Sequence, residues 1–286
     1  MALAGRTARR LPLGTQQPAP GELAVKMPVV IVTGASRGIG AAAARAAARL
    51  GASVALAGRT QAALQQAAVE IETAGGQALP IAADVGQEAD CRAVITAVLA
   101  RFGRIDALIN NAGTIGPIGP LAEVETTEWM RNWAVNLFAP VLLTKLALPA
   151  LRQSAEEGVG GRVIHITSGA AENPIAGWGA YTTAKAALNQ FTRVLAAEEP
   201  ALTVLAVRPG TVDTEMQKTI RAAGRGRMGE QNYQWLTGLY AQGRLLPPDA
   251  PGKAIAVLAL HAPREWSGAI TAWDEARVQE LAQRYE

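Results

Sequence analysis

The chain has 286 residues, of which 49% are hydrophobic and 18% are charged, with a formal net charge of +3 at pH 7. Residues 1–26 hold four basic residues and one acidic residue, so residues 27–286 are neutral overall and lack the basic surface of a nucleic-acid-binding protein. A single cysteine, Cys91, excludes an intrachain disulfide and fits a reducing cytoplasm, and no apolar run reaches the roughly 18 uncharged residues that a membrane-spanning helix needs.

Residues 1–26 contain prolines and small residues without a sustained apolar period, which predicts a flexible N-terminal extension. The scarcity of acidic residues faintly resembles a transit peptide, but Met27 would also make a sensible start, so both alternatives stay open. A single domain is expected over residues 27–286. His165 and His261 are far apart and no ligand cluster surrounds the one cysteine, so we expect no metal site.

From residue 28 the chain alternates between strand and helix patterns. Val29–Thr33 is a continuous β-branched run, which is typical of a strand buried on both faces. Further strands are expected at residues 53–57, 78–82, 105–109, 163–167, 202–207 and 269–272. Helical patterns lie between nearly all of them, at residues 38–50, 60–74, 88–102, 127–152, 181–198 and 249–260, with Thr60 as the N-cap of the second. The alternation predicts an α/β fold with a parallel sheet of about seven strands and helices on both faces.

The polar and glycine motifs of this chain follow the ends of the predicted strands. In open α/β sheets, ligands bind at that edge of the sheet. Glycines follow the first strand, and motifs of the same kind follow five others: Gly58-Arg59, Asp84-Val85, Asn110-Asn111-Ala112-Gly113, Ser168 and Pro209-Gly210. We therefore expect one binding site along this rim.

The turn after the first strand reads TGASRGIG, with Gly34, Gly38 and Gly40. Glycines there let a pyrophosphate approach the helix N-terminus, although a tight strand-to-helix turn would need them too. The second strand ends in Arg59 rather than in the acidic residue that binds the ribose of NAD, and Arg37 lies in the glycine turn. Two guanidinium groups suit a 2′-phosphate, so we expect NADPH rather than NADH. The alternative is two solvated surface arginines.

Tyr181 and Lys185 are one helical turn apart, so they project from the same face. An ammonium at that distance is expected to lower the pKa of a phenol from about 10 and to make it a usable proton donor. Ser168 ends the strand beneath, where its hydroxyl could bind a substrate oxygen. The three groups suit ketone reduction, which needs stabilisation and protonation of an alkoxide. Alternatively the tyrosine packs in the core and the lysine reaches solvent, and the pair alone does not decide.

Over residues 28 to about 275 the chain resembles the short-chain dehydrogenase/reductase family. The matching motifs are TGASRGIG, Asp84-Val85, NNAG at 110–113, Asn136, Ser168, Tyr181-x-x-x-Lys185 and RPGTVDT at 208–214. The resemblance implies a Rossmann-type doubly wound fold and an NADP(H)-dependent oxidoreductase that reduces a ketone or aldehyde to the alcohol.

The resemblance also implies roles for single residues. Tyr181 would donate the proton and Ser168 would position the carbonyl. Lys185 would lower the pKa of Tyr181 and hold the nicotinamide ribose, while Asn136 would support a proton-relaying water. Cofactor contacts are expected at Gly34, Ser36, Arg37, Gly38, Ile39, Gly40, Arg59, Thr60, Asp84, Val85, Asn110, Ala112, Gly113, Tyr181, Lys185, Pro209, Gly210, Val212 and Thr214. Substrate contacts are expected at Ser168, Trp178 and Tyr181.

By the same resemblance, residues 215–248 would form a mobile lid over the substrate, with glycine hinges. Its basic residues Lys218, Arg221, Arg225 and Arg227 either attract an anion or are solvated. Many relatives end the last strand with Asp-Gly-Gly, whereas Trp273-Asp274-Glu275 here leads into an amphipathic helix, an ending comparable to that of pterin-reducing relatives and of some uncharacterised carbonyl reductases. A pterin reductase and a non-catalytic NADPH sensor are thus alternatives to a general carbonyl reductase. The family's habit of pairing through two long central helices implies a homodimer or homotetramer.

Overall fold

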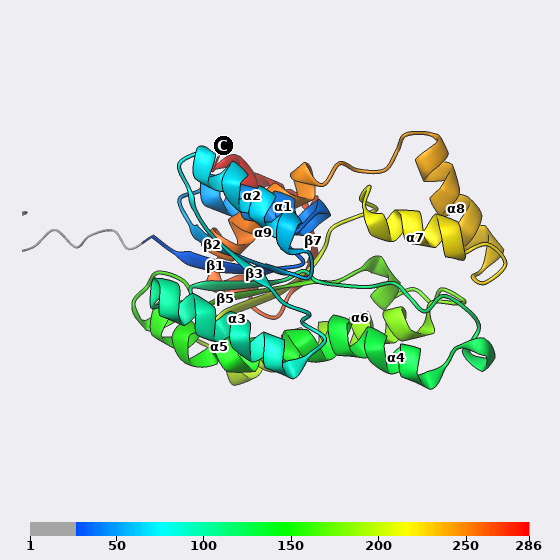
Figure 1. Cartoon of the computed structure of the whole chain (residues 1–286), viewed down its shortest axis with the longest axis horizontal. Helices are drawn as coiled ribbons and strands as arrows, with labels where there is room; N and C mark the ends of the chain where they lie inside the picture. The colour runs from blue at the N-terminus through cyan, green and yellow to red at the C-terminus, as the bar shows by residue number, and fades with distance from the viewer. Residues whose placement is uncertain (1–26, 286) are drawn as a thin grey trace, which may run out of the picture.

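A seven-stranded parallel sheet forms the centre of the protein in a computed structural model that describes residues 27–285 (Figure 1). The predicted N-terminal extension at residues 1–26 lies outside the described residues. The strands are arranged in the order β3-β2-β1-β4-β5-β6-β7, so the strand order reverses between β1 and β4. Their bounds are Val29–Thr33 (β1), Ser53–Gly58 (β2), Gln77–Ala82 (β3), Ala107–Asn110 (β4), Arg162–Ile166 (β5), Thr203–Arg208 (β6) and Ile270–Ala272 (β7). The predicted parallel sheet is confirmed.

Helices cover both faces of the sheet, as predicted (Figure 1). One face packs against α1, α2, α9 and α10, and the other packs against α3, α5 and α6. Every residue of β1 is buried between these layers, which explains its unbroken β-branched sequence. The bounds are Gly38–Arg49 (α1), Gln61–Thr73 (α2), Glu88–Phe102 (α3), Ala139–Glu156 (α5), Gly179–Glu198 (α6), Asp249–His261 (α9) and Ala276–Gln283 (α10).

The long helix predicted at 127–152 is interrupted. It consists of α4 (Thr126–Trp133), one π-helical turn (Ala134–Phe138) and α5. Over Thr126–Glu156 this segment is long and apolar enough to cross a membrane by length and composition. Arg131, Lys145 and Arg152 interrupt it, so the expectation that no uncharged run reaches about 18 residues still holds. One face of α5 nevertheless packs into the core through residues such as Leu143 and Leu151, as expected of a core helix.

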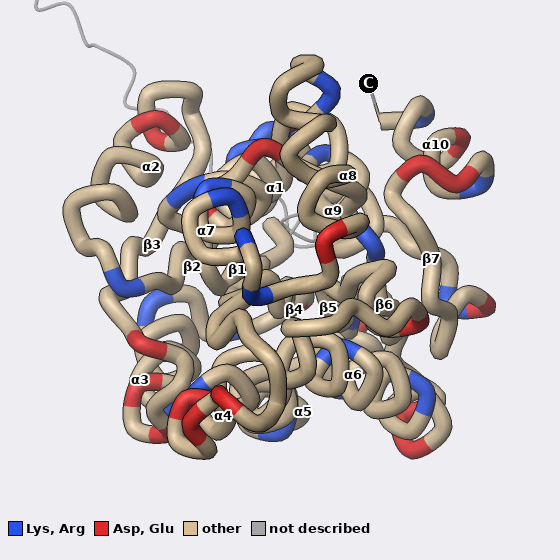
Figure 2. The backbone as a smooth tube through the Cα atoms, turned by 90° about the vertical axis from the view of Figure 1, so that its right-hand side faces the viewer, with Lys and Arg blue, Asp and Glu red and all other residues tan. Residues whose placement is uncertain are grey.

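Two helices stand apart from the layers, at the edge where the strands end (Figures 1 and 2). They are α7 (Glu215–Ala223) and α8 (Glu230–Ala241), and they make up much of the predicted lid at 215–248. The glycine-rich part of the lid is the loop between them. The lid therefore has its own secondary structure and lies over the rim at which the site is expected.

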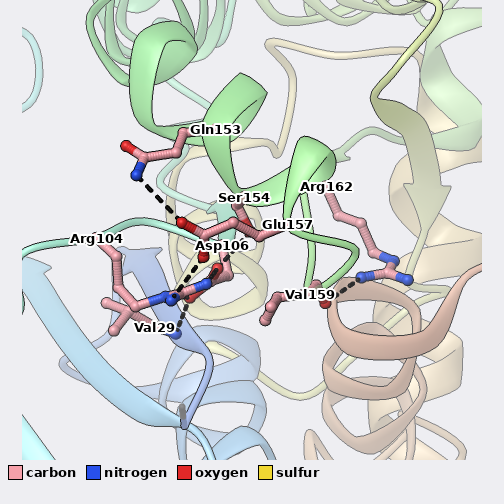
Figure 3. Close-up of polar contacts among 8 residues, drawn as sticks. All are labelled: Val29, Arg104, Asp106, Gln153, Ser154, Glu157, Val159 and Arg162. Carbon is pink, nitrogen blue, oxygen red and sulfur yellow. Dashed lines mark hydrogen bonds and ion pairs between the residues drawn. The ribbon is translucent and has the colours of Figure 1, made fainter. Parts of the chain in front are cut away.

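At the end of the sheet opposite the carboxyl ends of the strands, a buried carboxylate connects several segments (Figure 3). It belongs to Asp106, which lies just before β4. Asp106 accepts hydrogen bonds from the backbone N–H of Val29 at 2.7 Å, from the Arg104 guanidinium at 2.6 and 2.8 Å and from the Ser154 hydroxyl. Arg104 also pairs with Glu157 at 3.1 Å. These contacts join the start of β1, the segment before β4 and the end of α5, away from the strand ends at the rim.

Candidate active site

A cavity of about 1060 Å³ opens at the carboxyl ends of the strands. Segments that follow all seven strands contribute to its lining, together with α4 and both lid helices. Most of the predicted cofactor residues line it: Gly34, Ser36, Arg37, Gly38, Ile39, Arg59, Thr60, Asp84, Val85, Ala112, Gly113, Tyr181, Lys185, Pro209, Gly210, Val212 and Thr214. The predicted substrate contacts Ser168 and Trp178 line it too. The structure thus gathers most of the expected residues around one space, while Gly40, Asn110 and Asn136 lie behind its wall.

The glycine turn leaves no room for larger side chains. Gly34 and Gly38 have φ values of +66° and +56°, which L-residues with side chains rarely adopt. A Cβ atom on Gly40 would lie 2.3 Å from the carbonyl oxygen of Gly34, so Gly40 serves close packing of α1 against the turn rather than contact with a ligand. Gly38 and Ile39, at the start of α1, line the cavity, and a helix N-terminus at this place fits the pyrophosphate of a dinucleotide.

Arg37 and Arg59 both line the cavity, from the turn after β1 and from the end of β2. Both residues are exposed, so their guanidinium groups are available to a ligand. Thr60 takes the predicted N-cap position of α2, but its side chain makes no capping hydrogen bond, which corrects that part of the prediction. The end of β2 therefore presents one cation and one hydroxyl to the cavity.

Tyr181 and Lys185 lie on α6 and are both buried against the cavity. Lys185 Nζ donates a hydrogen bond to the carbonyl oxygen of Ile166, at the end of β5, at 2.8 Å, and lies 5.8 Å from the centroid of the Tyr181 ring. The Ser168 hydroxyl forms a hydrogen bond with Tyr181 and accepts one from the N–H of Ala170 at 3.2 Å. Phenol, hydroxyl and ammonium therefore meet at the end of one strand, as the sequence predicts.

The electrostatics of this cluster differ from the prediction. Burial raises the pKa of the Tyr181 phenol above 10.0, and the hydrogen bond with Ser168 acts in the opposite direction. Burial also lowers the pKa of the Lys185 ammonium from 10.5 to about 8. The expected lowering of the Tyr181 pKa by Lys185 is wrong for this arrangement, because loss of water around the phenol disfavours the phenolate more than the neighbours favour it. A phenol that keeps its proton at neutral pH is the form that a proton donor requires.

Asn136 lies in the π-helical turn between α4 and α5, directly behind the site. Its Nδ2 donates to the carbonyl oxygen of Thr114 at 2.8 Å and to Asn132 Oδ1 at 2.9 Å, and its Oδ1 accepts from the N–H of Thr114 at 3.3 Å. A Cβ atom on Gly113 would lie 3.0 Å from Asn136 Oδ1 and 3.8 Å from Lys185 Nζ. Asn136 is thus near Lys185, and π turns of this kind occur mostly at functional sites.

Asn110 does not line the cavity, which corrects its assignment as a cofactor contact. Its Nδ2 donates to Thr144 Oγ1 at 3.3 Å and lies 3.2 Å from His165 Nδ1, so the side chain packs in the core. The neighbouring Asn111 lines the cavity instead, and its Nδ2 donates to the carbonyl oxygen of Thr33 at 2.8 Å. Side chains alternate between the two faces of a strand, so two adjacent asparagines in NNAG point in opposite directions. This alternation is the sequence signal that could have pointed to Asn111 in place of Asn110.

Sequence reasoning assigned no role to Asn132, which lines the cavity and donates to the carbonyl oxygens of Thr114 and Gly116 at 3.1 and 2.7 Å. It lies one turn before Asn136 and was hidden within the predicted continuous helix. Trp129 and Trp133, by contrast, pack against the start of α6, where Trp133 Nε1 donates to the carbonyl oxygen of Ala180 at 3.1 Å. These contacts fix α4 against the helix that carries Tyr181.

Comparisons with known proteins agree with this geometry. The family model for short chain dehydrogenases matches residues 28–224. A benzil reductase ((S)-benzoin forming) of Saccharomyces cerevisiae is 34% identical over 81% of this chain and 90% of its own. A sepiapterin reductase of Meriones unguiculatus is 39% identical over 68% of this chain and 77% of its own.

Solved structures show the same likeness. The KRED1-Pglu enzyme shares 35% identity, with a TM-score of 0.80 over 85% of this chain and all of that chain. A variant of the actinorhodin polyketide ketoreductase, solved with NADPH, shares 27% identity, with a TM-score of 0.76 over 86% of this chain and 95% of its own. A 3-ketoacyl-(acyl-carrier-protein) reductase of Brucella melitensis, solved with NADH, shares 29% identity, with a TM-score of 0.74 over 88% of this chain and 98% of its own. By its fold, its site and these matches, the chain belongs to the short-chain dehydrogenase/reductase family of nicotinamide-dependent oxidoreductases.

Proposed function

We propose that this protein is an NADPH-dependent reductase that converts the carbonyl group of a small molecule into an alcohol. The observation that carries the proposal is the meeting of Ser168, Tyr181 and Lys185 in the cavity that the glycine turn also lines. A nucleotide-binding turn and a protonated phenol in one cavity supply the two halves of carbonyl reduction, hydride transfer and proton transfer.

The side chains have distinct tasks in this reaction. NADPH, held by its pyrophosphate at the glycine turn, would supply the hydride. Tyr181 donates its phenolic proton to the carbonyl oxygen, and the Ser168 hydroxyl bonds the same oxygen and orients it. Lys185 offers a positive charge beside the phenol as it loses its proton, while Asn136 keeps Thr114 and the Gly113 turn in place through its carboxamide.

The preference for NADPH over NADH rests on Arg37 and Arg59. Both line the cavity where the adenosine ribose of a dinucleotide lies in this type of fold, and β2 ends without an acidic residue. A guanidinium group favours a 2′-phosphate through charge-assisted hydrogen bonds.

Two other functions fit parts of the evidence. A pterin reductase is favoured by the similarity to a sepiapterin reductase and by Trp273-Asp274-Glu275 after β7. An NADPH sensor would keep the nucleotide site but would not need the buried Tyr181-Lys185 pair. We also propose the cytoplasm as the location and a homodimer or homotetramer as the assembly, on the single buried Cys91 and on the family membership.

The test is to follow NADPH absorbance with a panel of ketones, diketones and pterins. Oxidation of NADPH that depends on a carbonyl compound supports the proposed function, and turnover of pterins alone supports the pterin alternative. Tight binding of NADPH without oxidation by any member of the panel contradicts a reductase and supports the sensor.

A further inference from the structure

The cavity has an apolar wall beside Tyr181. Six residues that line the cavity belong to the hydrophobic cluster around this tyrosine: Ala170, Ile175, Trp178, Met216, Ile220 and Leu236. They come from the loop after β5, from the start of α6 and from both lid helices. A substrate whose carbonyl reaches the Tyr181 hydroxyl therefore meets hydrocarbon on this side of the cavity.

The cations of α7 do not line the cavity. Lys218 Nζ pairs with Glu215 Oε1 at 2.5 Å on the surface of α7. The Arg221 guanidinium carbon lies 3.7 Å from the centroid of the Tyr240 ring, in a stacked cation–π arrangement between α7 and α8. Both cations are engaged within the lid.

Two more lid cations lie in the loop between α7 and α8, and Arg244 follows α8. Arg227 Nε donates to the carbonyl oxygen of Ile118 at 2.8 Å, and Arg225 is exposed. Within residues 27–285, none of the lid's five cations, Lys218, Arg221, Arg225, Arg227 and Arg244, is part of the cavity lining. The two possibilities for the basic residues of the lid were attraction of an anionic substrate and exposure to solvent. The structure does not support the first.

The other cations of the cavity do not replace them as a counterion. Lys185 Nζ already donates to the carbonyl oxygen of Ile166 and lies 5.8 Å from the centroid of the Tyr181 ring, outside the hydrophobic cluster of the wall, so its charge serves the reacting group. Arg208, farther along the cavity, pairs with Glu172 at 3.0 Å and lies 3.6 Å from Glu275. Arg131 lines the cavity from α4, where it is exposed and outside the hydrophobic cluster of the wall. A carboxylate against the apolar wall would thus lose its water without gaining a partner, which costs several kcal/mol.

The wall also has an aromatic edge. The rings of Trp178 and Tyr181 meet at 89°, with centroids 5.9 Å apart, and both line the cavity. Aromatic rings associate in edge-to-face and offset arrangements at such distances, so an aryl group beside the reacting carbonyl would find matching partners.

On the basis of the proposed function, we infer that the substrate is an uncharged ketone that carries an aromatic or similarly bulky apolar group next to the carbonyl. Its reduction adds a hydride from NADPH to the carbonyl carbon and the Tyr181 proton to the oxygen, which gives the alcohol and NADP⁺. The apolar wall disfavours anionic 2-oxo acids, because it offers their carboxylate no cationic partner.

The test compares two ligands that share one reacting group, ethyl benzoylformate and the benzoylformate anion. Titration calorimetry of the protein saturated with NADP⁺ measures their binding, because no hydride is then available. The ester is expected to bind at least about 30-fold more tightly, which corresponds to about 2 kcal/mol. Equal or tighter binding of the anion, or binding of neither compound, overturns the inference.

The proposed function is judged separately, by NADPH oxidation. Selective binding of the ester without oxidation of NADPH, by it or by the rest of the carbonyl panel, supports the apolar substrate site and contradicts the reductase. Turnover of small or anionic carbonyl compounds without ester binding supports the reductase and contradicts the inference.

A matched pair of variants locates the selectivity. Met216→Lys places a cation on the wall with little change in side-chain length, and it is expected to shift the ester-to-acid affinity ratio at least about tenfold toward the acid. Thr219→Lys adds the same charge on the exposed side of α7 and is expected to leave the ratio unchanged. Equal ratios in the two variants would show that the wall does not set the selectivity.

Discussion

Arg227 and Ile118 are 109 positions apart in the chain, yet Arg227 Nε donates a hydrogen bond to the Ile118 carbonyl oxygen at 2.8 Å. Nearby, Gly119 N–H donates to the Gly177 carbonyl oxygen at 2.9 Å, and Gly229 N–H donates to that of Ala176 at 3.1 Å. The loop between the lid helices is thus fastened to two loops beside the active site, one of which leads directly into Tyr181.

This fastening predicts the behaviour of Arg227→Ala. Loss of a charge-assisted hydrogen bond at a partly exposed position is worth about 1 kcal/mol, so KM for the ketone should rise about fivefold. The NADPH Kd should stay the same, because Arg227 is not among the residues that line the cavity. Arg225→Ala, in the same loop, is the control, and Arg227→Lys should recover part of the loss. Unchanged KM in Arg227→Ala would show that the contact does not hold the lid.

The cofactor preference predicts the behaviour of Arg59→Asp. A carboxylate at the end of β2 repels a 2′-phosphate and accepts a ribose hydroxyl, so the ratio of kcat/KM for NADPH to that for NADH should fall at least about 100-fold. Arg92→Asp, on the exposed surface of α3 outside the cavity, provides the charge control. An unchanged ratio in Arg59→Asp would contradict the assignment of the phosphate to this residue.

Buried Asp106 predicts a large effect on stability. Asp106→Asn keeps the shape of the side chain but removes the negative charge that pairs with Arg104 and accepts the Val29 N–H. Breaking a buried ion pair costs about 3–5 kcal/mol of folding free energy. Thermal unfolding should therefore begin about 10 °C lower, as measured by circular dichroism. Glu88→Gln, in the exposed Glu88–Arg92 pair, should cost less than about 1 kcal/mol. Equal losses in the two variants would contradict a structural role for the Asp106 cluster.

His165 predicts how stability depends on pH. Burial and the nearby Lys185 charge lower its pKa from 6.5 to about 3. Between pH 6.5 and 3 the unfolded chain binds a proton at this residue that the folded protein does not, so stability falls as the pH falls through this window. From pH 7 to 5 the loss from this residue is about 2 kcal/mol.

The measurement is urea unfolding at both pH values, with His165→Asn as the comparison. Asparagine does not titrate, so the difference in stability between pH 7 and 5 should be about 2 kcal/mol smaller in the variant, whatever its absolute stability. His261→Asn, at the partly buried end of α9, serves as the second comparison. An identical pH difference in wild type and His165→Asn would contradict the buried neutral imidazole.

The sheet and most of the cavity could be predicted from the sequence, because both depend on patterns of residues that are close together in the chain. Buried strands have continuous apolar runs, and a parallel sheet brings all of its strand ends to one rim, so motifs such as Asp84-Val85 and Ser168 converge there without knowledge of any contact. The glycine turn was recognisable for the same reason. Gly40, behind the turn, needed the structure to distinguish packing from binding.

What the sequence could not predict depends on distant contacts. The π turn at Asn136 is stabilised by hydrogen bonds with Thr114, and nothing in the helical periodicity indicates it. The Tyr181 pKa depends on how completely the surrounding layers exclude water, and only the position of Lys185 could be read from the spacing. Likewise, a run of charged residues in the sequence does not indicate that Arg227 donates a hydrogen bond to the carbonyl oxygen of Ile118.

The most direct test of the account is Tyr181→Phe, with NADPH oxidation and NADPH binding measured on the same preparation. Removal of the proton donor should lower kcat about 10²–10⁴-fold, while the NADPH Kd, from nucleotide fluorescence, stays within about twofold of wild type. Tyr240→Phe, on the exposed side of α8, should keep wild-type turnover. Wild-type turnover in Tyr181→Phe would contradict the central claim that this phenol supplies the proton.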